Sequence, residues 1–167
     1  ATAKHPARVI GDAHYEVAAH LGREKLANMP GLNEFTDAME KVFNAADPDG
    51  LALFAAFKSM PLAEDTPARA MQLAASLREF RGSAHLIAIR AVGLTSKQAH
   101  YVKRPNDVKG FGWGEDEAPV VDDQVRALMV QAEHLTDALC IPAYSVLNDA
   151  ERKALVAGVK AFEAALA

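Results

Sequence analysis

Helical periodicity runs through almost the whole of this chain, and convincing alternation of period two is almost absent. The longest example follows Thr66-Pro67, where apolar residues recur in steps of three and four: Ala70, Leu73, Leu77, Phe80, Ala84, Ile87 and Ala91. Such steps place side chains on one face of a helix. We therefore predict an all-α protein whose longest helix contains this apolar face.

That face keeps its phase across Gly82, so we predict one helix and not two. A glycine inside a helix costs about 1 kcal/mol relative to alanine. Close approach of another helix is the simpler reason for tolerating it, and close approach of a ligand is the alternative.

Local signals divide the chain into about seven helices. Asp47-Pro48 has the cap-plus-proline pattern of a helix start and predicts a short helix that ends near Phe57. Gly93 predicts the end of the longest helix. Thr95 and Gln98 form the capping-box pattern for the helix that follows. With 167 residues, we expect a single compact domain over residues 1–167.

The composition excludes several classes of protein. Half of the residues are hydrophobic and 24% are charged, as in ordinary soluble proteins. A net charge of −4 counts against a protein that coats nucleic acid by bulk charge, although it leaves a local basic patch open. No apolar run approaches the roughly 20 residues of a membrane span. We therefore expect no membrane partner. The single cysteine, Cys140, excludes an intramolecular disulfide, so we expect a reducing, cytoplasmic location.

The longest predicted helix carries the first group of candidate site residues. Arg78, Arg81 and His85 are spaced i, i+3 and i+7, which puts them on one line beside the apolar face. Two cations and an imidazole could bind an anionic or carbonyl-bearing ligand, and histidine readily serves as an acid or base near neutral pH. The alternative is a solvated helix edge on which Glu79 and neighbouring acids pair with the arginines.

A second group lies after the Gly93 corner. His100 and Tyr101 end a short helix, and Phe111 and Trp113 follow in a long loop rich in glycine. Basic and aromatic residues on a loop can contact phosphates or stack on bases, and a lid over a pocket would use the same residues.

Metal and cofactor motifs give no further candidates. Glu16 and His20 are four residues apart, but the H-E-x-x-H and paired E-x-x-H patterns are absent, so we predict no metal ligands. No motif indicates a particular cofactor, so whether the protein uses one stays unknown.

Three stretches resemble segments of one protein family. They are LFAAFKSMPLAEDTPARAMQLAASLREFRGSAHLIAIRAVGLTSKQAH, GFGWGEDE and HLTDALCIPAYSVL. They are similar to an uncharacterised actinobacterial helix-turn-helix family with an L-R-E-H-R-G-x-x-H pattern, over about residues 51–166. The resemblance implies a partly winged-helix-like topology and a role in regulation. The chain departs from the family pattern after Glu117, where the segment for a recognition helix and a clear wing is missing.

Three functions follow as hypotheses. The main one is a small-molecule-binding helical protein, whose pocket lies near the Arg81/His85 line and the 101–113 loop. Its expected ligand-binding residues are Arg78, Arg81, His85, Tyr101, Phe111 and Trp113. The first alternative is a small cofactor-independent enzyme that uses His85 or His100 as general acid or base, with Arg81 holding an oxyanion. The second alternative is a DNA-binding transcriptional regulator. A homodimer through alanine-rich helix faces is left open.

Overall fold

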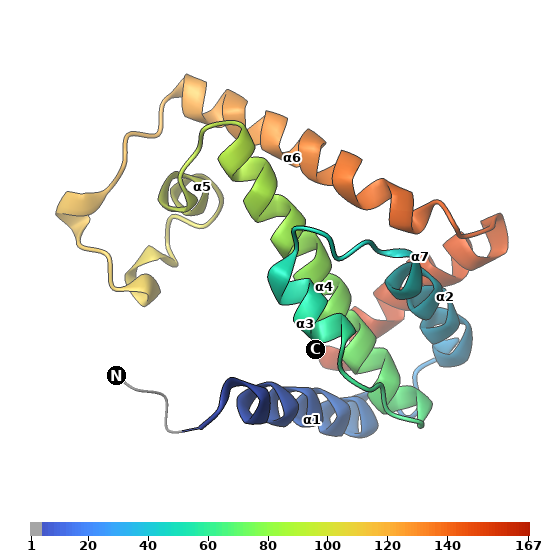
Figure 1. Ribbon diagram of the computed structural model, residues 1–167. Coiled ribbons are helices and arrows are strands. Elements are labelled where there is room, and N and C mark those ends of the chain that lie inside the picture. Colours follow the sequence, from blue (N-terminus) through green and yellow to red (C-terminus); the bar gives the residue numbers. More distant parts are fainter. Residues whose placement is uncertain (1–4) are drawn as a thin grey trace. The chain divides into compact units, whose positions relative to one another are not determined.

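The computed structural model describes residues 5–167, apart from the side chains of residues 7, 108, 109 and 115. Within this range the chain forms seven α-helices and no β-strand (Figure 1). The helices are α1 (Ala7–Lys25), α2 (Leu32–Ala45), α3 (Ala52–Lys58), α4 (Thr66–Ala91), α5 (Ser96–Lys103), α6 (Asp123–Tyr144) and α7 (Asp149–Leu166). The all-α prediction is therefore confirmed.

Two short 3-10 helices, Val108–Phe111 and Glu115–Glu117, lie in the long loop between α5 and α6. In the part of the chain that the structure describes, no helix combines the length and the apolar character needed to cross a bilayer.

Contacts divide the chain into two compact units. Unit 1 comprises residues 1–80 and 142–167, and unit 2 comprises residues 81–141. The α4 helix continues from unit 1 into unit 2, and α6 continues from unit 2 into unit 1. The expectation of a single domain over the whole chain stays a prediction.

Unit 1 is built around aromatic side chains. Phe54 of α3 is completely buried, and its ring lies 4.9 Å from that of Phe80 and 6.1 Å from that of Phe43. The α7 helix packs on α2 where Gly158 meets Phe35. A Cβ atom at Gly158 would lie 2.2 Å from the Phe35 ring, so this glycine is what lets the two helices approach.

Unit 2 contains the second part of α4, all of α5 and most of α6. The predicted apolar face of α4 is buried from Ala70 to Ala84, but Ile87 is 40% exposed and Ala91 is exposed as well. Ala88 and Ile89 are buried in its place, at 0% and 5% exposure. The prediction for Ile87 and Ala91 is wrong because a helical repeat of 3.6 residues allows a step of three or four, and α5 and α6 pack on the face that contains Ala88.

Two other sequence expectations need correction. Asp47-Pro48 starts a turn and not a helix, since the Asp47 carboxylate accepts the Asp49 N–H at 3.0 Å and α3 begins only at Ala52. Gly82 does lie inside one continuous helix, as predicted. However, no described atom outside its own helical turn lies within 4 Å of the position that a Cβ would take there, so close approach of another helix does not explain it.

Candidate functional site

A four-residue turn joins α4 to α5 in unit 2. Gly93 has φ of 85°, a left-handed conformation that L side chains rarely adopt. The Leu94 N–H donates to the Ile89 carbonyl at 3.0 Å, and the Gly93 N–H donates to the Arg90 carbonyl at 3.1 Å. These two bonds form a Schellman motif, which ends α4 at the glycine, as predicted.

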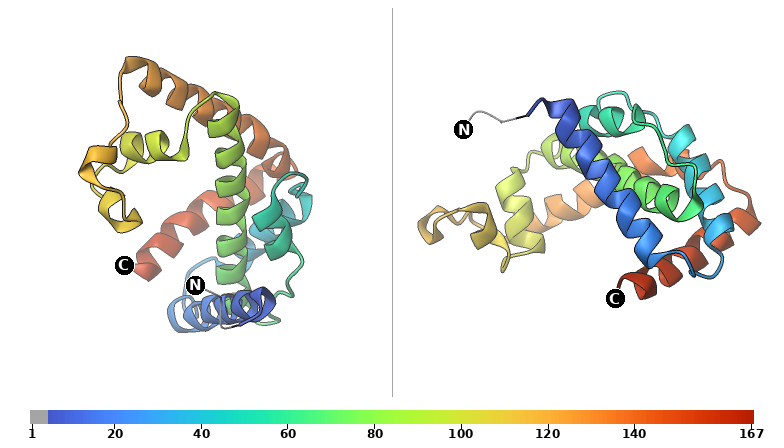
Figure 2. Two further views of the ribbon diagram at one scale, coloured as in Figure 1. Left: turned by 60° about the vertical axis from the view of Figure 1, so that its left-hand side comes forward. Right: turned by 90° about the horizontal axis from the view of Figure 1, so that it is seen from below.

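The α5 helix starts at once after this turn. The Thr95 hydroxyl accepts the Gln98 N–H at 3.1 Å, and the Gln98 side chain accepts the Thr95 N–H at 3.0 Å. The predicted capping box is therefore confirmed. Figure 2 shows that α5 turns away from α4 and does not continue its direction.

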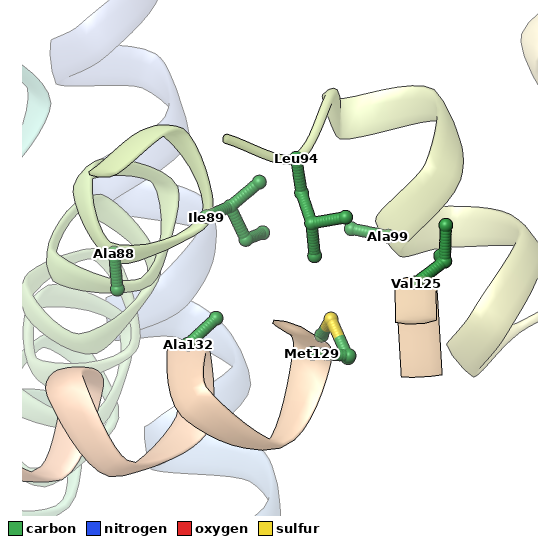
Figure 3. Close-up of a cluster of buried hydrophobic side chains, with 7 residues drawn as sticks. All are labelled: Ala88, Ile89, Leu94, Ala99, Val125, Met129 and Ala132. Carbon is green, nitrogen blue, oxygen red and sulfur yellow. The ribbon is translucent and has the colours of Figure 1, made fainter. Parts of the chain in front are cut away.

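A small apolar core holds the two helices in this arrangement. Leu94, which is 1% exposed, points from the turn between Ile89 and Ala99 (Figure 3). The α6 helix closes the core from the other side with three buried residues, Val125, Met129 and Ala132. The turn and both helices around it are thus fixed by packing as well as by backbone hydrogen bonds.

An aromatic cluster covers the outer face of α5. The ring of His100 lies 4.6 Å from that of Phe111 and 5.7 Å from that of Trp113, in edge-to-face contacts. The Trp113 ring stacks on Phe111 at 5.0 Å and on Tyr101 at 6.2 Å. The loop after α5 therefore folds back over the helix that precedes it.

The same loop engages the first turn of α5 through charge. The Lys97 ammonium lies 2.7 Å from a Glu117 carboxylate oxygen and 5.3 Å from the centre of the Trp113 ring. The hydrogen bond from Lys97 lowers the pKa of Glu117 below its usual value. Only 26% of the Lys97 side chain remains exposed.

Glu133 of α6 forms ion pairs with two basic side chains of unit 2. Its carboxylate lies 2.9 Å from Arg81 of α4 and 2.7 Å from Lys103 at the end of α5. The hydrogen bond from Lys103 is the main cause that lowers the pKa of Glu133. This carboxylate therefore ties α4, α5 and α6 together.

His85 belongs to the same network. The Thr136 hydroxyl donates to the Ala132 carbonyl at 2.7 Å, so it accepts the hydrogen bond from His85 Nδ1 at 2.8 Å. Burial is the main cause that lowers the pKa of His85, and the Glu133 carboxylate 4.0 Å away opposes that shift. The neutral imidazole with its proton on Nδ1 is the form that fits this site.

The structure brings together most of the sequence-predicted site residues, but in two groups. Arg81 and His85 meet at Glu133, and His100, Tyr101, Phe111 and Trp113 gather on α5. Arg78 belongs to neither group. It lies in unit 1, pairs with the adjacent Glu79, and lines a cavity of about 360 Å³ beside α1.

Sequence reasoning missed Lys97, Glu117, Glu133 and Thr136. Their partners lie 20 to 52 positions away in the chain, so no local spacing could reveal them. A usable signal exists only for Lys97, because it occupies the first turn of the helix after the Gly93 corner.

Comparison with known proteins gives one positive result. Residues 1–117 match the model of a helix-turn-helix family. No curated protein and no solved structure matches the chain. The matched range contains the α4–Gly93–α5 turn, its capping box and the aromatic residues that cover α5.

This match contradicts the main functional hypothesis, a small-molecule-binding protein with its pocket near the Arg81/His85 line, and favours the DNA-binding alternative. The physical reason is visible in the contacts. Arg81 and His85 are engaged by Glu133 and Thr136, and the aromatic residues of the 101–113 loop pack on α5.

Proposed function

The chain belongs to this helix-turn-helix family, because the match spans residues 1–117 of 167, and we propose that it is a DNA-binding regulator that reads duplex DNA with α5. In such proteins the second helix of the motif enters the major groove, and residues of its N-terminal part contact base edges. The actinobacterial subgroup and its R-G-x-x-H motif stay predictions.

The observation that carries the proposal is the corner between α4 and α5. Two helices joined by a short turn that contains glycine are the elements of a helix-turn-helix. Here the turn consists of residues 92–95, with Gly93 in the left-handed conformation and Leu94 buried beneath it. Under this proposal α5 is the recognition helix, whereas the sequence analysis expected that helix after Glu117 and regarded it as missing.

Charge and exposure on α5 fit the same role. Thr95 and Ser96 are exposed at its start. Lys97 and Lys103 of α5 and Arg104 at its C-cap place three cations along eight residues, in a protein whose net charge is −4. Lys97 is paired with Glu117 and Lys103 with Glu133, so each of these two ion pairs must open before its lysine contacts a phosphate. Contacts between such cations and phosphates supply most of the affinity for DNA, so a local basic cluster allows DNA binding by a protein whose overall charge is negative.

Two further expectations belong to this proposal. A homodimer would match DNA sites with two half-sites about one helical turn apart, as dimeric helix-turn-helix proteins do. A cytoplasmic location, where a bacterial regulator would meet DNA, is also part of it.

The test is a fluorescence-anisotropy titration of a labelled mixed-sequence duplex of about 30 base pairs, long enough for two half-sites. If Lys97, Lys103 and Arg104 contact phosphates, the logarithm of the association constant falls with the logarithm of salt concentration, with a slope of about −2 to −3 per chain. Absence of binding at low salt contradicts the proposal.

A charged substitution tests whether α5 is the contact element. Ser96→Glu adds an anion to the first turn of α5, where a carboxylate interacts favourably with the helix dipole, so α5 stays folded. Repulsion from phosphate is expected to weaken DNA binding by about tenfold or more. The matched control is Ala52→Glu, which adds the same charge at the exposed first position of α3 in unit 1. Equal affinities of the two variants would show that α5 is not the contact element.

A further inference from the structure

We propose that Phe111, Trp113 and Glu117 form an intramolecular clamp on α5, and that duplex DNA binds only when this clamp is released. The inference rests on the proposed function, because it concerns the availability of the same helix. The clamp residues follow α5 in the chain, and each contacts a side chain of that helix.

The contacts of the clamp cover the helix from its first turn to its last. Glu117 holds Lys97 at 2.7 Å in the first turn. Phe111 meets His100 at 4.6 Å, and Trp113 stacks on Tyr101 at 6.2 Å farther along. Aromatic pairs and a cation over a ring are both favourable contacts, so the closed arrangement is stabilised by several of them together.

The chemistry of Glu117 identifies what it competes with. A lysine in the first turn of a recognition helix would be paired with a DNA phosphate. In the free protein that ammonium is paired with the Glu117 carboxylate. Under the proposal, this anion occupies the lysine that a DNA phosphate would otherwise bind. DNA must therefore displace Glu117 before Lys97 can contribute to binding.

The alternative is that this loop acts as a wing and contacts DNA directly. Charge argues against it, because Asp116 and Glu117 are both exposed and would face the phosphates. The direction of the rings argues against it as well, since Trp113 makes its contacts with Lys97, His100 and Tyr101 of α5. We therefore treat the loop as a competitor of DNA.

The size of the effect follows from the population of open protein. When only a fraction of the molecules is competent, the apparent dissociation constant equals the intrinsic one divided by that fraction. Loss of one exposed ion pair changes such an equilibrium by about two- to fivefold. Opening of the clamp is thus expected to tighten DNA binding by that factor.

The experiment compares two full-length variants in the same duplex titration. Glu117→Gln removes one negative charge and the ion pair with Lys97. Asp116→Asn removes one negative charge from the same short 3-10 helix and is the matched control for bulk electrostatics. We expect Glu117→Gln to bind about two- to fivefold more tightly than Asp116→Asn. Equal affinities, or weaker binding by Glu117→Gln, would overturn the clamp.

Trp113, the only tryptophan of the chain, gives a second readout that needs no DNA. Its fluorescence should be quenched by acrylamide more strongly in free Glu117→Gln than in Asp116→Asn, because the ring leaves α5. Addition of duplex to the wild-type protein should also raise this quenching. If duplex lowers it, Trp113 is covered by DNA, and the loop is a wing.

The outcomes separate the clamp from the proposed function. Wild-type protein that binds duplex, with Glu117→Gln no tighter than its control, refutes the clamp and leaves DNA binding intact. Failure of wild-type protein and both variants to bind duplex refutes DNA binding, and the clamp as a regulator with it.

Discussion

Replacement of Gly82 by alanine should stabilise the protein. Gly82 lies in the interior of α4, is exposed, and has no described atom outside its own turn within 4 Å of the position that a Cβ would take. The added methyl group therefore meets no obstacle, and the change recovers the helix-propensity difference of about 1 kcal/mol. Chemical unfolding followed by circular dichroism should show a higher midpoint, and the thermal midpoint should rise by about 2–4 °C.

Gly158→Ala is the matched comparison, since it makes the same chemical change in the interior of α7. There the new Cβ would lie 2.2 Å from the Phe35 ring, so overpacking costs about 1–3 kcal/mol and outweighs the gain in helix propensity. The two variants should shift the free energy of unfolding in opposite directions. Destabilisation by Gly82→Ala would refute the reasoning, because it would mean that something packs against this position.

Three further predictions concern unit 2. Gly93→Ala should lower the free energy of unfolding by about 1–2 kcal/mol, measured in urea, because φ of 85° is strained for alanine. Glu133→Gln should lower it by about 1 kcal/mol at neutral pH, since Arg81 and Lys103 lose their shared anion. Burial lowers the pKa of His85 in the folded protein. As pH falls, the His85 imidazole is therefore protonated in the unfolded chain at a higher pH than in the folded protein. Stability from His85 is therefore full above about pH 6.5 and is lost progressively below it. Urea midpoints compared between about pH 7.5 and about pH 5.5, on either side of the ordinary histidine pKa, should fall more in wild-type protein than in His85→Gln. Equal losses in the two proteins would contradict this assignment.

The parts of the fold that depend on neighbouring residues could be predicted from the sequence. Gly93 ends α4 and Thr95 caps α5 because both act through backbone groups within five residues. The prediction of a helix start at Asp47-Pro48 failed because the pattern is ambiguous at the local level. An aspartate before a proline can cap a helix or form a turn, and the tertiary packing of the neighbouring residues decides between them.

The candidate site could be predicted only in part. The spacing of Arg81 and His85 placed them correctly on one face of α4, but their partner Glu133 is about 50 positions away. Without that carboxylate, an arginine beside an imidazole resembles a ligand site, and this resemblance favoured the small-molecule hypothesis. The contact between Trp113 and Tyr101 of α5 is likewise tertiary, and no local sequence pattern predicts it.

The most direct test of the central claim is an amide NMR titration of the full chain with a mixed-sequence duplex at low salt. We expect the largest chemical-shift changes at Thr95, Ser96, Lys97 and the rest of α5, with Trp113 following as the clamp opens. Shift changes confined to unit 1, or no changes with the duplex in excess, would contradict the assignment of α5 as the DNA-reading helix.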